Sequence, residues 1–293
     1  MRLLAISNTT ALPRAAASLL LTLATFAVPA GAQSVTFLES QVLDRIGGRV
    51  RVKLVRQQGS RRAEQAWPEE GPPWLFVRAA GGQQNYGPER PFPRAEGALV
   101  LRLAPGDATL VGAELERRSE RIAAEQLLEF IELHVSPQAR PKELSSAALI
   151  GPQLVRRTES LKLVVRSDRS KIQPSGSAQA KSGQYAEIRP FADPTRTPVG
   201  SDLPFRVYLP GGAKHGRLTA THLPSGAKQV VALDAAGIGY ITLNAVGTWT
   251  LQAHSFRKIE EPDSGDKRQS AWDLVSTTLV FEARANRQLG QER

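Results

Sequence analysis

The feature that most constrains the fold is a series of short alternating segments over residues 184–284, separated by turn-forming residues. Apolar side chains that recur at every second position are typical of strands with one buried face. Seven strands are predicted, at 185–190, 205–209, 217–223, 229–234, 239–243, 248–256 and 274–283. Seven short strands in about a hundred residues predict an immunoglobulin-like or transthyretin-like β-sandwich for this C-terminal part.

The strand predicted at 248–256 shows which side chains such a sandwich buries. Its apolar set is Trp249, Leu251 and Ala253, and its alternate set is Thr250, Gln252 and His254. We expect the apolar set to fill the core and the alternate set to face the other way. The chain contains no cysteine, so its core has to form without a disulfide bond.

Residues 33–166 are predicted to form a second, N-terminal domain that is also rich in strands. Alternation is strict at 49–54, and shorter apolar runs at 74–77 and 98–103 end at turn signals. The two-residue period returns at 161–165, where it places Lys162 on the face away from the leucines. The chain from residue 33 onward is therefore predicted to be mainly β.

One segment of this N-terminal domain has helical spacing instead. Near 120–134 the apolar residues recur every three to four positions, which predicts one short amphipathic helix. Ser119 is its predicted N-cap, and Pro137 lies beyond its predicted end.

The boundary between the two predicted domains is set by composition. Residues 167–183 are rich in Ser, Gly, Ala and Lys and offer little to bury, so they are predicted to be a flexible linker. The sandwich then covers 184–284, and 285–293 is predicted to be a disordered tail.

The first 32 residues have the composition of a secretory leader. Arg2 and Arg14 precede an uncharged apolar run at 15–28, and an A-x-A sequence ends at Ala32. Such a run is too short to span a bilayer and is typical of a signal peptide, cleaved here before Gln33. The sequence therefore predicts export to the periplasm.

The charge of the chain limits its partners. The formal net charge is +10, and the basic residues are scattered along the sequence rather than concentrated beside aromatic residues. Nucleic-acid binding is therefore not predicted. After the leader, no apolar segment approaches the roughly 20 residues of a membrane span. A protein partner in the cell envelope stays open, and the sequence does not define the oligomeric state.

Histidines are the natural transition-metal ligands in a chain without cysteine. There are four, His134, His215, His222 and His254, and none forms a metal-binding motif by its spacing. His222 and His254 are the weak candidates for a shared site, because both lie on predicted strands of the sandwich. Their alternation also allows them to lie on opposite faces, so surface or capped histidines are the competing interpretation. No other cofactor is predicted.

Two further patterns are weaker still. Ser225 with Lys228, and Ser264 with Lys267, match the S-x-x-K spacing of serine acylases, but both lie in predicted turns without the companion motifs. The acidic loop at 258–267 offers oxygen atoms for Ca²⁺, without the spacing of an EF-hand. No catalytic residue is therefore predicted, and the chain is expected not to be an enzyme.

The layout resembles a bacterial periplasmic domain-of-unknown-function family that is described as a periplasmic component of cobalt or nickel uptake. The segments that carry the resemblance are 186–194, 199–208, 216–221, 234–243, 247–256 and 272–281. Members of that family commonly begin with a His-containing segment, whereas no histidine precedes His134 here.

Two functions are consistent with these observations. The resemblance implies a periplasmic, non-enzymatic accessory or binding protein linked to nickel or cobalt handling. The alternative is an envelope scaffold or protein-interaction module with no metal role, which pairs through its edge strands. A hydrolase is the third and least supported hypothesis.

Overall fold

The computed structural model describes residues 34–44, 48–58, 61–69, 71–87, 91, 94–95, 98–103, 108–141, 144, 151–166, 176–212, 216–259 and 272–285. The predicted leader and most of the predicted tail lie outside these residues, as does the central part of the acidic loop. Within the described part of the chain, no helix has the length and hydropathy needed to cross a membrane.

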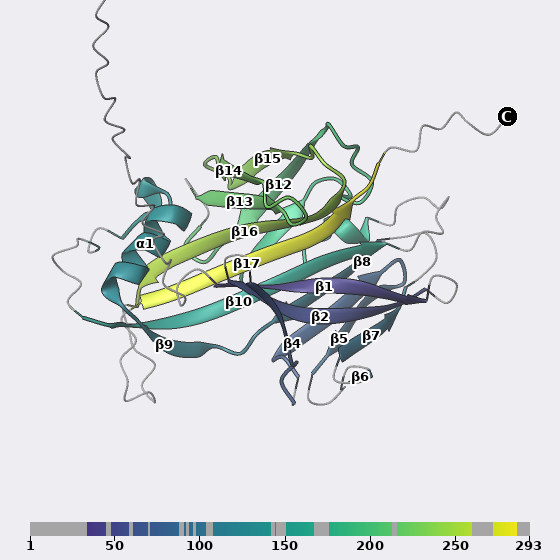
Figure 1. Cartoon of the computed structure of the whole chain (residues 1–293), viewed down its shortest axis with the longest axis horizontal. Coiled ribbons are helices and arrows are strands. Elements are labelled where there is room, and N and C mark those ends of the chain that lie inside the picture. The colour runs from purple at the N-terminus through teal and green to yellow at the C-terminus, as the bar shows by residue number, and fades with distance from the viewer. Residues whose placement is uncertain are drawn as a thin grey trace, which may run out of the picture.

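The molecule is built around one nine-stranded sheet, whose long strands cross the molecule side by side (Figure 1). Eight of its strands follow one another in the order β14 (Lys228–Ala232), β13 (Arg217–His222), β16 (Gly247–Lys258), β17 (Trp272–Ala283), β10 (Gln153–Arg166), β8 (Ala108–Glu114), β4 (Trp74–Ala79) and β5 (Gly82–Tyr86). The ninth strand, β9 (Arg118–Ile122), pairs with the first residues of β10.

Two smaller sheets cover parts of this central sheet. The three-stranded sheet consists of β11 (Glu187–Pro190), β12 (Asp202–Tyr208) and β15 (Ile238–Thr242). The five-stranded sheet consists of β1 (Ser34–Asp44), β2 (Arg49–Gln58), β3 (Arg61–Gln65), β6 (Arg94–Ala95) and β7 (Ala98–Arg102). The helices are α1 (Ala124–His134) and the single turns η1 (Pro137–Ala139) and η2 (Ser177–Gln179).

Alternation along the central strands supplies apolar side chains to both faces. Leu279 and Phe281 of β17 join the core under the three-stranded sheet, whereas Val280 joins the core under the five-stranded sheet. A third cluster packs α1 against one end of β10, β16 and β17. Neighbouring residues on one strand are both buried, because the three-stranded sheet covers one face of the central sheet and the five-stranded sheet covers part of the other.

The prediction of a mainly β fold with a β-sandwich is confirmed. All seven predicted strands from 185 onward are present as β11 to β17, with boundaries that differ by a few residues. The three-stranded sheet faces the β13–β16–β17 region, and Phe205 and Ile241 meet Trp249 and Leu251 in the core between them.

The predicted helix is present but begins later than expected. Ser119 belongs to strand β9, where it pairs with Arg156 of β10, and the N-cap residue is Ala123, whose side chain makes no capping hydrogen bond. Pairing with β10 decides the conformation of this segment because it satisfies backbone groups that a longer helix would otherwise satisfy itself. Pro137 does lie beyond the end of the helix, at the start of η1.

The predicted division into two linked domains differs from the structure. β10 comes before the predicted linker and β17 comes near the end of the chain, yet they pair in parallel over ten residues of the central sheet, from Val155↔Trp272 to Val164↔Phe281. The first part of the predicted linker lies outside the described residues. Its remainder is packed, with Ser177, Ala178 and Ser182 buried.

Polar contacts attach this segment to the sheet. The Gln184 amide nitrogen donates to the carbonyl oxygens of Ala113 (3.0 Å) and Leu161 (3.1 Å). Lys162 Nζ lies 2.7 Å from Glu187 Oε1, and both side chains are at most 1% exposed. Lys162, expected to face away from the core, is therefore fully buried because β11 covers that face.

Candidate functional site

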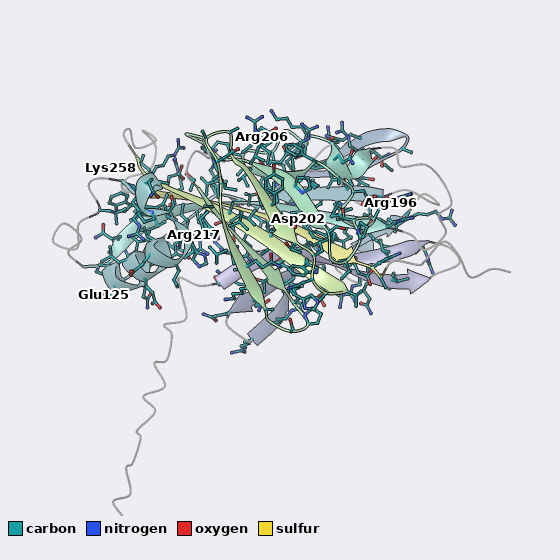
Figure 2. The ribbon with its side chains drawn as sticks, turned by 90° about the horizontal axis from the view of Figure 1, so that it is seen from above. Glu125, Arg196, Asp202, Arg206, Arg217 and Lys258 are labelled. Atoms are coloured by element: carbon teal, nitrogen blue, oxygen red, sulfur yellow. The ribbon has the colours of Figure 1, made fainter. Side chains whose placement is uncertain are left out.

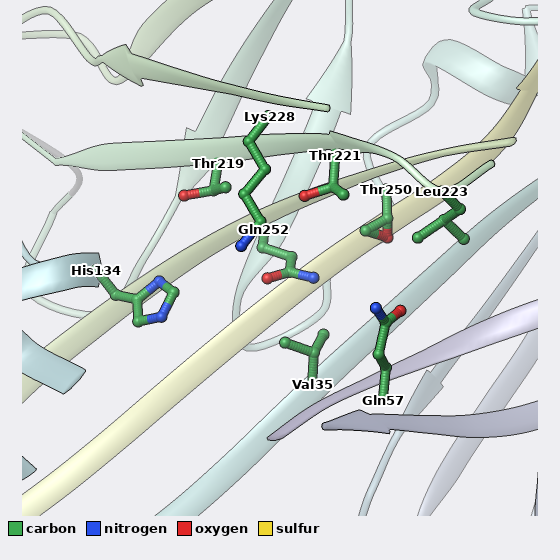
Figure 3. Close-up of a pocket in the computed structure, with 9 residues that line it drawn as sticks. All are labelled: Val35, Gln57, His134, Thr219, Thr221, Leu223, Lys228, Thr250 and Gln252. Atoms are coloured by element: carbon green, nitrogen blue, oxygen red, sulfur yellow. The ribbon is translucent and has the colours of Figure 1, made fainter. Parts of the chain in front are cut away.

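A cleft opens on the face of the central sheet that the three-stranded sheet does not cover (Figure 3). Its walls are the C-terminal end of α1 on one side and the ends of β1 and β2 on the other. Its volume is about 110 Å³. We call it the polar cleft, and its lining residues are Val35, Gln57, His134, Thr219, Thr221, Leu223, Lys228, Thr250 and Gln252.

The floor of the polar cleft follows from the two-residue period of β13 and β16. Cross-strand pairing places Thr219 opposite Gln252 and Thr221 opposite Thr250, so the four side chains form one block. Leu218, Ala220, Leu251 and their neighbours point to the opposite face and fill the core. Trp249 was predicted to face the core and Thr250 and Gln252 to face the other way, and this prediction is confirmed. Both are nevertheless buried, at 1% and 7% exposure, because α1, β1 and β2 rise around them.

One charged side chain reaches into the polar cleft. Lys228 is the cross-strand neighbour of Thr221 on β14, and Figure 3 shows it extending from that strand toward Gln252. The lining residues include no carboxylate, and no ion pair of Lys228 is found within the described part of the chain. The charge of the cleft is therefore positive.

Two buried polar atoms of the lining make no hydrogen bond within the described structure. They are the Thr250 hydroxyl oxygen and His134 Nδ1. Buried polar groups in folded proteins are nearly always hydrogen-bonded, and leaving one unsatisfied costs about 1–3 kcal/mol. Their position at the cleft is what a ligand-binding surface provides.

Two imidazoles meet at the α1 end of the polar cleft. The rings of His134 and His254 lie 4.9 Å apart at an angle of 61°, and Phe130 packs against both. His254 Nδ1 lies 2.9 Å from the Ser276 hydroxyl. Burial, together with the positive charges of Lys228 and Arg217, lowers the pKa of His134 from its ordinary 6.5 to about 4. Burial, then His134 and Arg157, lower the pKa of His254 well below its ordinary value. Both rings are therefore neutral at pH 7.

Arg217 explains part of this positive potential. It projects from β13 beside α1 (Figure 2), and its guanidinium donates to the carbonyl oxygens of Glu132 (3.2 Å) and Leu133 (2.9 Å). It therefore caps the C-terminal end of the helix, where a positive charge is favourable. The same contact fixes His134, the last residue of α1, at the edge of the cleft.

The structure does not bring the two predicted metal-site histidines together. His222 pairs across the strands with Trp249 and lies on the core side of the sheet, whereas His254 lies on the cleft side. Both ring nitrogens of His222 have partners, the Ser225 hydroxyl at 2.8 Å and the Val246 carbonyl oxygen at 2.9 Å. His215 lies outside the described residues.

The described residues also do not fit a nickel or cobalt centre elsewhere. No three His, Asp or Glu side chains in this part of the chain are grouped closely enough to hold a metal ion. The rings of His134 and His254 do lie together, but the positive charges that act on His134 are those of Lys228 and Arg217. Their positive charges oppose the binding of a divalent cation.

The first S-x-x-K pattern does not assemble in the structure. The Ser225 hydroxyl bonds to His222 on the core side of the hairpin, whereas Lys228 turns to the polar cleft. Ser264 and Lys267 lie outside the described residues, as do the acidic residues between 260 and 266. Sequence reasoning thus named Lys228 for a different role and did not single out His134, which lies at the end of the predicted helix.

Comparison with known proteins adds little to this geometry. No family profile matches the sequence, and no curated protein matches it. One solved structure, described as a tetra-tandem repeat in the extending region of a large adhesion protein, matches at 10% identity with a TM-score of 0.22. The match covers 86% of this chain and 50% of the other, so the chain spans half the length of that structure. A likeness of this size carries no argument about function.

Proposed function

We propose that this chain is an exported, non-enzymatic binding protein of the cell envelope, and that it holds a small ligand in the polar cleft. The observation that carries this proposal is the floor of the cleft. Thr219, Thr221, Thr250 and Gln252 present hydroxyl and amide groups side by side on two paired strands. Small-molecule sites combine a concave shape with a few fixed polar groups in this way.

The positions of these groups favour holding a ligand over reacting with it. Three threonine hydroxyls, two glutamine amides, one ammonium and one imidazole line the cleft. These groups donate and accept hydrogen bonds, and the two strands that carry the four floor residues, β13 and β16, are fixed by pairing on both sides. A catalytic role would need a nucleophile beside a base. In the described part of the chain, two serine hydroxyls, those of Ser225 and Ser276, bond to an imidazole, and neither serine lines the cleft.

The proposed location in the envelope rests on the sequence of residues 1–32, and the link to metal uptake rests on the family resemblance. An accessory protein beside a nickel or cobalt transporter is compatible with a ligand other than the metal itself. The described histidines give no support to a role in carrying the ion, because they do not form a ligand set. We therefore place the ligand, and not a metal, in the polar cleft.

A thermal-unfolding screen tests this proposal. The purified protein is heated with a panel of small polar ligands, anions and divalent metal ions. A ligand at about 100 times its dissociation constant adds roughly 2.7 kcal/mol to the stability, which raises the midpoint by a few degrees. We expect a protecting ligand for the wild type and no protection of Thr250→Val, which removes one hydroxyl from the floor.

Thr158→Val is the matched control for this screen. Thr158 is also buried, and its hydroxyl also lacks a partner within the described structure, but it lies on β10 and does not line the cleft. The control should keep full ligand protection. Equal protection of both variants, or no protection of the wild type by any ligand of the panel, would contradict the proposal.

The alternative function, a protein-interaction module, has one observation in its favour. Val230 of β14 and Tyr240 of β15 are each 60% exposed on strands at the edges of their sheets. Photo-crosslinking from position 240 in cells would favour this function if it captured one defined envelope protein while Thr250→Val left the cellular role intact.

A further inference from the structure

The chemistry of the polar cleft indicates the class of its ligand, and this inference rests on the function proposed above. Among the described residues that line the cleft, Lys228 is the charged one and none is a carboxylate. Arg217 adds positive charge beside the His134 ring, whereas the charge of Arg157 is paired with Glu120 at 3.0 Å. A cation entering this cleft would meet like charges on β13 and β14, whereas an anion would be attracted by both.

The donors are arranged for oxygen atoms. Lys228 is the cross-strand neighbour of Thr221, which lies opposite Thr250, and its ammonium extends over the floor toward Gln252 (Figure 3). The Thr250 hydroxyl has no partner in the described structure and is free to donate. Hydrogen bonds from a charged donor to an oxyanion are about twice as strong as neutral ones. A volume of about 110 Å³ accommodates one small oxyanion group.

The protonation of His134 depends on whether the cleft holds an anion. Its Nδ1 has no hydrogen-bond partner in the described structure, and the ring borders the cleft. The groups that face the ring are Lys228 of β14, Arg217 of β13 and His254 of β16. Burial and the charges of Lys228 and Arg217 disfavour a positive charge on His134, so the ring is neutral before binding. A bound anion shifts this balance toward the protonated ring, because a nearby negative charge favours the charged form of an imidazole.

We propose that the polar cleft binds a small oxyanion of the phosphate, sulfate or carboxylate kind, either free or carried on a larger envelope molecule. Lys228 and the hydroxyls of Thr221 and Thr250 hold the oxygens. His134 takes up a proton as the anion binds and then donates a hydrogen bond to it. Binding is therefore tighter at pH 5 than at pH 7, and the proton is released when the anion leaves.

Calorimetric titration with sodium sulfate, inorganic phosphate and acetate tests this assignment. The titrations use the purified protein in low-salt buffers free of these ions, at pH 7 and at pH 5. Sulfate keeps its charge across this range, so any change in its affinity belongs to the protein. Lys228→Gln should weaken sulfate binding about tenfold or more, as expected for a lost charged hydrogen bond. His134→Gln should remove the difference between the two pH values.

Lys258→Gln is the matched control for charge. Lys258 is an exposed residue at the end of β16, where Figure 2 shows it apart from Arg217, and it does not line the cleft. Its replacement removes the same single positive charge but no group of the cleft lining, so it should leave sulfate affinity within about twofold. An equal loss in Lys228→Gln and Lys258→Gln would overturn the proposal in favour of general attraction to a basic surface.

The remaining outcomes separate the inference from the function on which it rests. If an uncharged ligand protects the wild type but not Thr250→Val while no anion binds, the cleft is a binding site and the oxyanion assignment is wrong. If neither anions nor uncharged ligands bind, both are wrong. If phosphate and sulfate bind but acetate does not, the assignment narrows to tetrahedral oxyanions. A larger envelope molecule that competes with sulfate would show that the natural ligand is an oxyanion group attached to such a molecule.

Discussion

At the scale of single residues, the most buried ion pair among the described residues is that of Lys162 and Glu187. Glu187 accepts hydrogen bonds from Lys162 Nζ (2.7 Å) and from the backbone nitrogens of Ser182 (2.8 Å) and Gly183 (3.2 Å). Lys162 Nζ also lies 3.2 Å from the Ile188 carbonyl oxygen. Every charged atom of the pair is thus hydrogen-bonded, which is the condition for tolerating charges in a protein interior.

Removing one partner of this pair should be costly. Glu187→Ala leaves the ammonium of Lys162 buried and unpaired, and we expect a loss of about 3–5 kcal/mol in the free energy of unfolding, measured by denaturant titration. Glu282→Ala, which breaks an exposed pair with Arg284, should cost less than about 1 kcal/mol. The double change Lys162→Met with Glu187→Leu should restore part of the stability, because the unpaired charge is gone while the two backbone nitrogens that donate to Glu187 lose their acceptor. A small effect of Glu187→Ala would show that the pair is solvated.

The pKa of His134 gives a second prediction at this scale. The unfolded chain takes up a proton near pH 6.5, whereas the folded protein does so near pH 4. Between these values the unfolded state binds more protons, so stability is lost as the pH falls through this window, at roughly 1 kcal/mol per pH unit. In a sulfate-free buffer, the wild type should therefore lose stability faster than His134→Gln on acidification from pH 6.5 to 4. Parallel stability profiles would contradict the assigned pKa.

The candidate site illustrates how far sequence reasoning reaches at this scale. The alternation of β16 predicted correctly that Thr250 and Gln252 share a face opposite Trp249. It did not predict that this face is enclosed, because the enclosing segments, β1, β2 and α1, come from the distant N-terminal part of the chain. The same limit applies to Lys162, whose partner Glu187 lies across the predicted linker.

At the scale of secondary-structure elements, local patterns predicted most of the strands. The seven C-terminal strands were predictable because each has alternating side chains and is bounded by turn residues, as at Gly237, which adopts a positive φ of 76° before β15. The start of α1 was not, because β9 obtains its conformation from pairing with β10. Helical spacing alone cannot distinguish these two outcomes for residues 119–122.

One side chain joins elements that the backbone leaves separate. Gln229 of β14 donates from its amide nitrogen to the Thr242 carbonyl oxygen (2.7 Å), and its amide oxygen accepts from the Thr242 backbone nitrogen (3.2 Å). The side chain thus takes the place of a neighbouring strand between the edges of the central and three-stranded sheets. Gln229 thereby satisfies one backbone donor and one acceptor on an edge strand.

Replacing Gln229 should therefore loosen this edge of the sandwich. Gln229→Ala removes two partly exposed hydrogen bonds, and we expect a loss of about 1 kcal/mol in the free energy of unfolding. Hydrogen exchange of the Thr242 amide should accelerate more than that of Ile241, which stays buried in the core. Unchanged exchange at Thr242 would show that the strand edge needs no such contact. Gln83→Ala, on the exposed edge strand β5, is the control and should have little effect.

At the scale of the whole molecule, the parallel pairing of β10 with β17 unites the two parts that composition separates. The paired residues are more than a hundred positions apart in the sequence, as in Val155↔Trp272. No local pattern predicts such a pairing, whereas the Ser- and Gly-rich composition of 167–183 is a direct indication of a linker. The prediction of two domains therefore followed the stronger local pattern and missed the shared sheet.

This shared sheet predicts joint unfolding. Residues from before and after the predicted linker share one core cluster, to which Leu279 of β17 belongs. Leu279→Ala should therefore lower the melting temperature of the entire molecule and reduce the free energy of unfolding by about 2–5 kcal/mol. Calorimetry should show one transition for the wild type and one, at lower temperature, for the variant. Two separate transitions, with only one of them shifted, would indicate that the parts unfold independently.

The polar cleft also belongs to this scale, because its walls come from β1, β2 and α1 and its floor from β13, β14 and β16. The account depends most directly on one measurement, the unfolding temperature of the wild type and of Lys228→Gln with and without sulfate at pH 5. We predict that sulfate raises the midpoint of the wild type by a few degrees and that the variant loses most of this gain. Equal sulfate stabilisation of the two proteins, or none of either, would contradict the assignment of the cleft as an oxyanion site.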